Sequence, residues 1–135
     1  MQNQSWVIEN ALMRSSRPGY PSENVDQETV ENWIREFSPE GIQSIICLLS
    51  ADQLDYYQQL PGGLLEYYRQ NGFHVAHIPI TDPAHDPAGV QELEQNLVQI
   101  YKTFLELPKP VLMHCSAGVD RTGRAVEFIL DKFER

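Results

Sequence analysis

The sequence predicts an α/β fold in which a mainly parallel central sheet is flanked by helices. Short apolar runs alternate with longer segments whose apolar residues recur every three or four positions, as strands alternating with helices do. The run at 43–49 is almost continuously apolar, which is typical of a strand covered on both faces. The 135 residues contain no internal repeat, so we expect one domain that spans residues 1–135.

The first third of the chain is predicted to form two short strands and one helix. Trp6–Glu9 and Leu12–Arg14 are the strands, and a stretch rich in proline and glycine at 17–21 ends the second. The helix starts after Asp26, a good N-cap residue, and ends at Gly41. Its apolar residues at helical spacing are Val30, Trp33, Ile34 and Phe37.

Two short helical pieces and another strand are predicted in the middle of the chain. The pieces are Gln53–Leu60 and Leu64–Asn71, with Pro61 and two glycines between them. Phe73–Ile80 alternates between apolar and polar residues, as a strand does. Thr81–Gly89 contains two prolines and two aspartates, so we expect a loop.

The last third is predicted to form a long helix, a brief strand and a final helix. The strand is Val111–Met113, and a loop that contains glycine leads from it into the final helix. The apolar face of the long helix comprises Val90, Leu93, Leu97, Ile100 and Phe104. The final helix carries Ala125, Val126, Ile129, Leu130 and Phe133.

Charge and cysteine content limit the classes of partner and compartment. The formal net charge of −9 repels DNA, RNA and anionic lipid, so we expect no nucleic-acid partner and no membrane anchor. The first ten residues have no basic cluster and no long apolar run, so we expect no targeting segment and a cytoplasmic location. We also expect the protein to be a monomer. Two cysteines are too few for a disulfide framework and fit a reducing compartment.

The loop between Val111–Met113 and the final helix is the most informative stretch. Its backbone N–H groups and the positive end of the following helix dipole form a cradle for an anion. The same field stabilises the thiolate of Cys115, a strong nucleophile. Arg121 offers a planar fork for two phosphate oxygens, and Gly118 lets the backbone turn without a side chain in the cradle. The predicted cradle comprises Ser116, Ala117, Gly118, Val119, Asp120 and Arg121.

These residues resemble the signature of the cysteine-dependent protein tyrosine and dual-specificity phosphatases. That signature is His-Cys, two residues, Gly, two residues, Arg and then Ser or Thr, and His114, Cys115, Gly118, Arg121 and Thr122 match it at every position. The resemblance implies that Cys115 attacks phosphorus to form a phosphocysteine and that Arg121 binds the phosphoryl oxygens. It also implies that Thr122 assists hydrolysis of the phosphocysteine, that His114 orders the loop, and that no metal or cofactor takes part.

Phosphoryl transfer also needs a general acid that gives a proton to the leaving oxygen. The run at 77–82 resembles the family's strand that ends in the acid loop, and this resemblance places the acid at Asp82. Asp86 in the same loop is the alternative. If one of these aspartates is not the acid, we expect it to start a turn, as Asp before Pro commonly does.

We therefore expect a phosphatase whose partner is a phosphorylated protein or peptide, with phosphotyrosine and also phosphoserine or phosphothreonine as substrates. The alternative is a phosphoinositide or inositol phosphate phosphatase, because members that act on phosphoinositides commonly carry Asp120, although Val119 replaces their loop lysine. A module that binds phosphoproteins without turnover is the hypothesis from another class. Cys47 is expected to fill the core, and some relatives suggest instead a reversible disulfide with Cys115.

Overall fold

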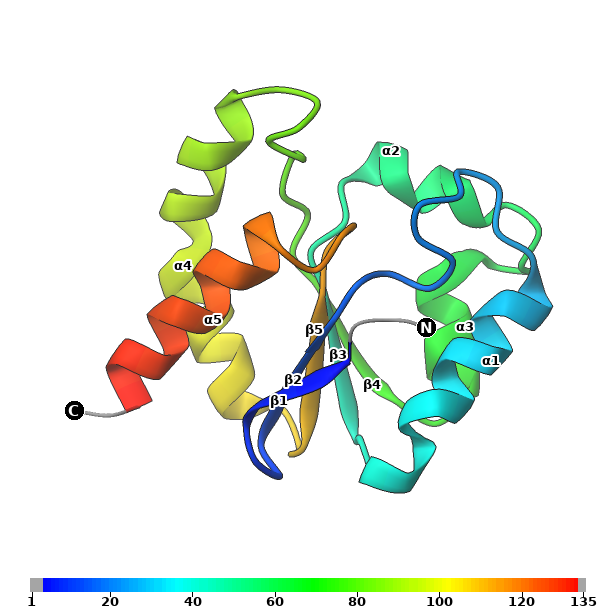
Figure 1. The fold of residues 1–135 in the computed structure, drawn as a ribbon, viewed down its shortest axis with the longest axis horizontal. Helices are drawn as coiled ribbons and strands as arrows, with labels where there is room; N and C mark the ends of the chain where they lie inside the picture. Colours follow the sequence, from blue (N-terminus) through cyan, green and yellow to red (C-terminus); the bar gives the residue numbers. More distant parts are fainter. Residues whose placement is uncertain (1–3, 134–135) are drawn as a thin grey trace.

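The computed structural model describes residues 4–133 as one central sheet between two layers of helices (Figure 1). Residues 1–3 and 134–135 of the predicted domain lie outside the described residues. The strands are β1 (Ser5–Ile8), β2 (Leu12–Ser15), β3 (Ser44–Cys47), β4 (His74–His77) and β5 (Val111–His114). The α-helices are α1 (Gln27–Phe37), α2 (Ala51–Leu54), α3 (Gly63–Gln70), α4 (Ala88–Glu106) and α5 (Asp120–Phe133), and Ser38–Glu40 and Asp55–Tyr57 form 3₁₀ turns.

The sheet has the strand order β1-β2-β5-β3-β4, and β1 is its antiparallel edge. The other four strands are parallel to their neighbours, which confirms the predicted mainly parallel α/β fold. Their register aligns the last residues of all four, because His114 lies opposite both Ser15 and Cys47, and Cys47 lies opposite His77. The loops that follow these strands therefore start from one edge of the sheet.

Each face of the sheet has its own hydrophobic core. Helices α4 and α5 cover one face and α1 and α3 cover the other (Figure 1). Along β3, Ile46 packs in the α4–α5 core, whereas Ile45 and Cys47 pack in the α1–α3 core. Residues 43–49 are almost continuously apolar because both faces of this strand are buried. Burying each Ile or Leu side chain contributes about 1.5–3 kcal/mol to the free energy of folding.

The helices begin close to where the sequence predicts them. Asp26 caps α1, since its carboxylate accepts a hydrogen bond of 2.9 Å from the Thr29 backbone N–H. Helix α4 starts two residues before Val90, and its first turn extends past the edge of the sheet (Figure 1). Val90 is consequently 56% exposed, and Phe133 in the last turn of α5 is 50% exposed. The prediction that Val90 belongs to the buried face of the long helix is wrong, whereas Phe133 lies on the final helix as predicted.

Within residues 4–133, no helix is both long enough and apolar enough to cross a lipid bilayer.

Candidate active site

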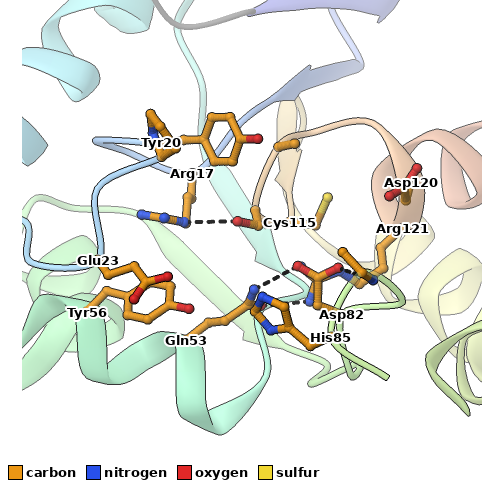
Figure 2. A pocket seen from close by; sticks show the side chains of 14 residues that line it. Arg17, Tyr20, Glu23, Gln53, Tyr56, Asp82, His85, Cys115, Asp120 and Arg121 are labelled. Carbon is orange, nitrogen blue, oxygen red and sulfur yellow. Dashed lines mark hydrogen bonds and ion pairs between the residues drawn. The ribbon is translucent and has the colours of Figure 1, made fainter. Parts of the chain in front are cut away.

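A cavity of about 270 Å³ lies at the carboxyl ends of the parallel strands (Figure 2). The segments after β2, β3, β4 and β5 each contribute to it, with Arg17, Gln53, Asp82 and Cys115 respectively. Parallel α/β sheets bind their ligands at this edge because the loops converge there. The remaining lining residues are Tyr20, Pro21, Glu23, Tyr56, Ala84, His85, Ser116, Ala117, Asp120 and Arg121.

The phosphate loop, residues 115–120, runs from the end of β5 to the start of α5. Cys115 is only 2% exposed, and α5 begins at Asp120, so the positive end of its dipole faces the loop. The backbone of Gly118 has φ +78°, and a Cβ there would lie 2.6 Å from the carbonyl oxygen of Ser15. Only glycine fits this position, because the backbone is left-handed and the neighbouring strand end is in contact with it.

Two arginines of the segment that contains β2 hold the phosphate loop from outside. The Arg14 guanidinium donates a hydrogen bond of 2.7 Å to the carbonyl of Gly118. The backbone N–H of Arg17 donates one of 2.8 Å to the carbonyl of Ser116. These bonds connect segments about a hundred residues apart in the chain and fix the shape of the loop before any ligand binds.

His114 is buried beneath the loop and is uncharged. Its Nδ1 lies 3.0 Å from the carbonyl oxygen of Cys115, which can only accept, so Nδ1 carries the proton. Its Nε2 therefore accepts a hydrogen bond of 2.9 Å from the Tyr68 hydroxyl. Burial lowers the pKa of His114 to about 4, so the ring stays neutral at pH 7. This geometry agrees with a role in ordering the loop.

Arg121 lies at the opposite side of the cavity and is 1% exposed. Its Nη1 donates to the carbonyl of Ile80 at 2.7 Å, to Oε1 of Gln53 at 2.9 Å and to the carbonyl of Leu48 at 3.2 Å. Its Nη2 forms an ion pair of 3.1 Å with the Asp82 carboxylate. The site thus pairs the predicted phosphate-binding cation with the predicted general acid.

The structure brings Asp82 into the cavity and leaves Asp86 outside its lining. Burial alone would raise the pKa of Asp82, but the backbone hydrogen bond from Ala84 and the charge of Arg121 outweigh it. The pKa of Asp82 is therefore lowered, and the carboxyl is ionised in this state. Asp86 is exposed and accepts a hydrogen bond of 3.0 Å from the Ala88 backbone N–H at the start of α4.

Gln53 is a site residue that the sequence analysis did not identify. It is buried, and its side chain accepts from Arg121 and donates a hydrogen bond of 2.9 Å to Asp82. The spacing Ser50-x-x-Gln53 forms a capping box, which is a sequence signal for a helix start. That signal places Gln53 at the beginning of α2 but does not reveal its contacts with groups 29 and 68 residues away.

The other predicted cradle residues divide between the cavity and the surface. Ser116, Ala117 and Asp120 line the cavity, whereas Val119 is exposed and does not. Thr122 is fully buried, and its Oγ1 is the buried side-chain polar atom without a hydrogen-bond partner among residues 4–133. Thr122 is not among the residues that line the cavity, and a buried hydroxyl without a partner lowers stability.

Both cysteines are free thiols, and they lie in different cores. Cys47 packs in the α1–α3 core, and burial raises the pKa of its thiol to about 12. Cys115 belongs to the α4–α5 core on the other face. This arrangement favours the interpretation of Cys47 as an unreactive core residue.

Comparison with known proteins identifies the family. Residues 22–132 match the model of a family described as "Polymorphic toxin system, DSP-PTPase phosphatase". The chain belongs to this phosphatase family. The match includes both the acid loop and the phosphate loop, and it confirms the resemblance to cysteine-dependent dual-specificity phosphatases that the signature indicates. No curated protein matches the chain.

Proposed function

We propose that this phosphatase hydrolyses phosphomonoesters on protein side chains, phosphotyrosine above all, through a phosphocysteine intermediate. The observation that supports this proposal most is that Cys115, Arg121 and Asp82 line one cavity although they come from two different loops. A nucleophile, an anion-binding fork and a proton donor are the three groups that phosphoryl transfer to a thiolate requires.

The entering phosphate competes with Asp82 for Arg121. A phosphate dianion carries more charge than a carboxylate and offers two oxygens to the guanidinium fork. Losing its ion pair and gaining an anionic neighbour both raise the pKa of Asp82, so that it takes up a proton. The resting ion pair of 3.1 Å thereby couples substrate binding to the protonation of the acid.

In the first step, Sγ of Cys115 attacks phosphorus, and the new S–P bond forms as the bond to the leaving oxygen breaks. Asp82 gives its proton to that oxygen. In the second step, water attacks the phosphocysteine, Asp82 takes the proton of that water, and the P–S bond breaks to release inorganic phosphate and the thiolate. The unpartnered hydroxyl of Thr122 lies in the first turn of α5, where it assists this hydrolysis.

Aromatic side chains around the cavity support an aryl phosphate as substrate. Tyr20 and Tyr56 both line it, and Figure 2 shows their rings on either side of the Arg17 side chain. Tyrosine rings stack on other aromatic rings with ring centres about 4.5–7 Å apart. A phosphotyrosine ring that contacts either of these two rings is partly desolvated, whereas phosphoserine has no ring to make such a contact.

Hydrolysis of p-nitrophenyl phosphate and of phosphotyrosine peptides in EDTA tests the proposal. We expect vanadate-sensitive turnover that Cys115→Ser abolishes and that the matched variant Cys47→Ala retains, since Cys47 lies in the other core. Retained turnover in Cys115→Ser would overturn the mechanism. Phosphopeptide binding without turnover by the unaltered protein would instead identify a binding module.

An inositol phosphate or phosphoinositide phosphatase is the second candidate, and one observation favours it. Asp120 lines the cavity, and so does Arg17. Arg17 supplies a cation in addition to Arg121, whereas the phosphate loop has Val119 in place of the lysine that phosphoinositide phosphatases commonly carry. Turnover of inositol phosphates without turnover of phosphopeptides would establish this candidate in place of the first.

The family description also names polymorphic toxin systems. We propose that phosphatase activity is the contribution of this chain to such a system, as a toxic activity. Induced expression in a bacterial host should slow growth with the unaltered chain and not with Cys115→Ser. Equal growth of the two strains at equal protein levels would contradict a toxic role.

A further inference from the structure

Arg17 is a buried cation beside the phosphate loop that the proposed mechanism does not use. It follows β2, is 2% exposed, and lines the same cavity as Cys115. Figure 2 shows Cys115 between the Arg17 side chain and the pair formed by Asp82 and Arg121. Arg17 precedes the residues that match the family, which start at residue 22.

The contacts of the Arg17 side chain are with neutral groups. Its Nε donates a hydrogen bond of 3.1 Å to the Ser116 hydroxyl, and its Nη1 donates one of 3.3 Å to the Tyr57 hydroxyl. The guanidinium carbon lies 4.7 Å from the ring centre of Tyr56 and 5.5 Å from that of Tyr20. Within residues 4–133, no carboxylate oxygen lies within 4.0 Å of the Arg17 guanidinium nitrogens, whereas Arg121 is paired with Asp82.

A buried cation without a counterion is unusual in a folded protein. Removing a guanidinium from water is costly, and neutral hydrogen bonds with cation–π contacts offset only part of that cost. Among residues 4–133, two of its five N–H groups have acceptors, which leaves others for a ligand in the cavity that it lines. The rings of Tyr20 and Tyr56 restrict the fork to one plane, so little side-chain entropy is lost when an anion binds.

We propose that Arg17 is a specificity-determining residue that binds a second anionic group of the substrate, a phosphate or carboxylate, next to the phosphate that Cys115 attacks. This inference rests on the proposed function, because it takes the cavity to be a phosphatase site. Two exposed carboxylates, Glu23 and Asp120, also line the cavity and oppose a second anion. The position of Arg17 deep beside Ser116 favours an anion attached close to the scissile phosphate over one at the rim.

Two matched substrate sets test the proposal and separate the two sources of the second anion. The peptide set carries phosphotyrosine next to Gln, Glu or phosphoserine, and the small-molecule set compares inositol monophosphate with an inositol bisphosphate whose phosphates are adjacent. In at least one set, we expect kcat/KM to rise about 10-fold or more with the second anion, mainly through KM. Arg17→Gln should bring this ratio close to one, and Arg17→Lys should leave an intermediate ratio.

Arg14→Gln is the matched control. Arg14 also donates to the phosphate loop, through the carbonyl of Gly118, but it does not line the cavity. We expect Arg14→Gln to lower activity on all substrates alike without changing the ratio. Glu23→Gln should increase the ratio, since it removes a negative charge from the cavity lining. A preference that survives Arg17→Gln, or an unaltered protein with no preference in either set, would overturn the proposal.

Binding of inorganic anions gives a readout that is independent of turnover. In the Cys115→Ser background, calorimetry should show that pyrophosphate binds about 10-fold or more tightly than orthophosphate, and that adding Arg17→Gln or Arg17→Lys reduces this difference. If phosphopeptides are not hydrolysed but this difference depends on Arg17, the proposed protein substrate fails and the second-anion site stands. If the difference is absent or independent of Arg17, the second-anion site fails even where phosphopeptides are hydrolysed.

Discussion

The phosphate loop and the acid loop meet in one cavity but are held in different ways. The phosphate loop is largely buried and is bonded by the segment around β2, through Arg14 at Gly118 and Arg17 at Ser116. The acid loop, residues 81–87, is mostly exposed beyond Asp82. Its tertiary bonds are two from Thr81 to the Glu92 carboxylate and those of Asp82 with Arg121 and Gln53.

This difference corresponds to what each loop would contribute in the proposed mechanism. An anion cradle works best when its donors are fixed before the ligand arrives, because no reorganisation is then needed. In that mechanism the proton donor leaves its partner Arg121 when substrate binds, which suits a segment with few bonds. The ion pair between Arg121 and Asp82 connects the start of α5 to the acid loop.

The largest expected effect is that of removing the fork of Arg121. Arg121→Lys should lower kcat/KM about 10³-fold, because lysine supplies a point charge where the phosphate needs two parallel donors. Steady-state kinetics with p-nitrophenyl phosphate measures this. The control is Arg124→Lys, which alters a surface pair with Glu94 and should leave kcat/KM unchanged. A loss of less than about 10-fold for Arg121→Lys would remove the fork from the mechanism.

Asp82→Asn should have the next largest effect, and it should depend on the leaving group. Turnover of phenyl and alkyl phosphates should fall about 10²-fold or more, whereas substrates with good leaving groups should be affected little. The basic limb of the pH–rate profile, which reports the acid, should disappear in the same variant. Equal activity of Asp82→Asn and the unaltered protein on all substrates would exclude Asp82 as the acid.

Because His114 is buried and neutral beneath the phosphate loop, the free energy of unfolding should depend on pH. Its pKa is about 4 in the folded state and 6.5 when unfolded, so the unfolded chain binds the extra proton between these values. The stabilisation from the neutral ring is complete above pH 6.5 and decreases as the pH falls, by about 2 kcal/mol at pH 5. Urea unfolding at pH 5 and pH 7.5 measures this decrease. His114→Gln should show a smaller one, and an equal decrease in both proteins would contradict the assignment.

The smallest expected effect concerns the exposed part of the acid loop. Asp86→Ala removes one hydrogen bond to the backbone of Ala88, which predicts a loss of about 0.5–1 kcal/mol in the free energy of unfolding. Turnover should change less than about twofold, as measured on phenyl phosphate beside Asp82→Asn. A large loss of turnover with a leaving-group dependence would transfer the role of the acid to Asp86 and reverse the comparison of the two aspartates.

Much of the phosphate loop could be predicted because its chemistry is contiguous in the chain. Cys115, Gly118 and Arg121 stand at a spacing that fits a strand, a tight loop and a helix start, and the family match confirms the resemblance. Helix and strand positions were predictable for a similar reason, since the period of the apolar residues reports which faces are buried. The exception is Val90, which lies in the first turn of α4, where the period continues but the covering surface does not.

The sequence by itself therefore determined the fold class and predicted the nucleophile, the anion cradle and a choice between two acids. Only the tertiary structure brought Arg17, Gln53 and Asp82 to the same cavity, because they follow three parallel strands whose carboxyl ends the register aligns. It also placed Asp86 outside the cavity lining, and it gave Arg17 no carboxylate partner among the residues that the structure describes. Such contacts depend on which strands are neighbours, and strand order is a property of long-range packing that local periodicity does not encode.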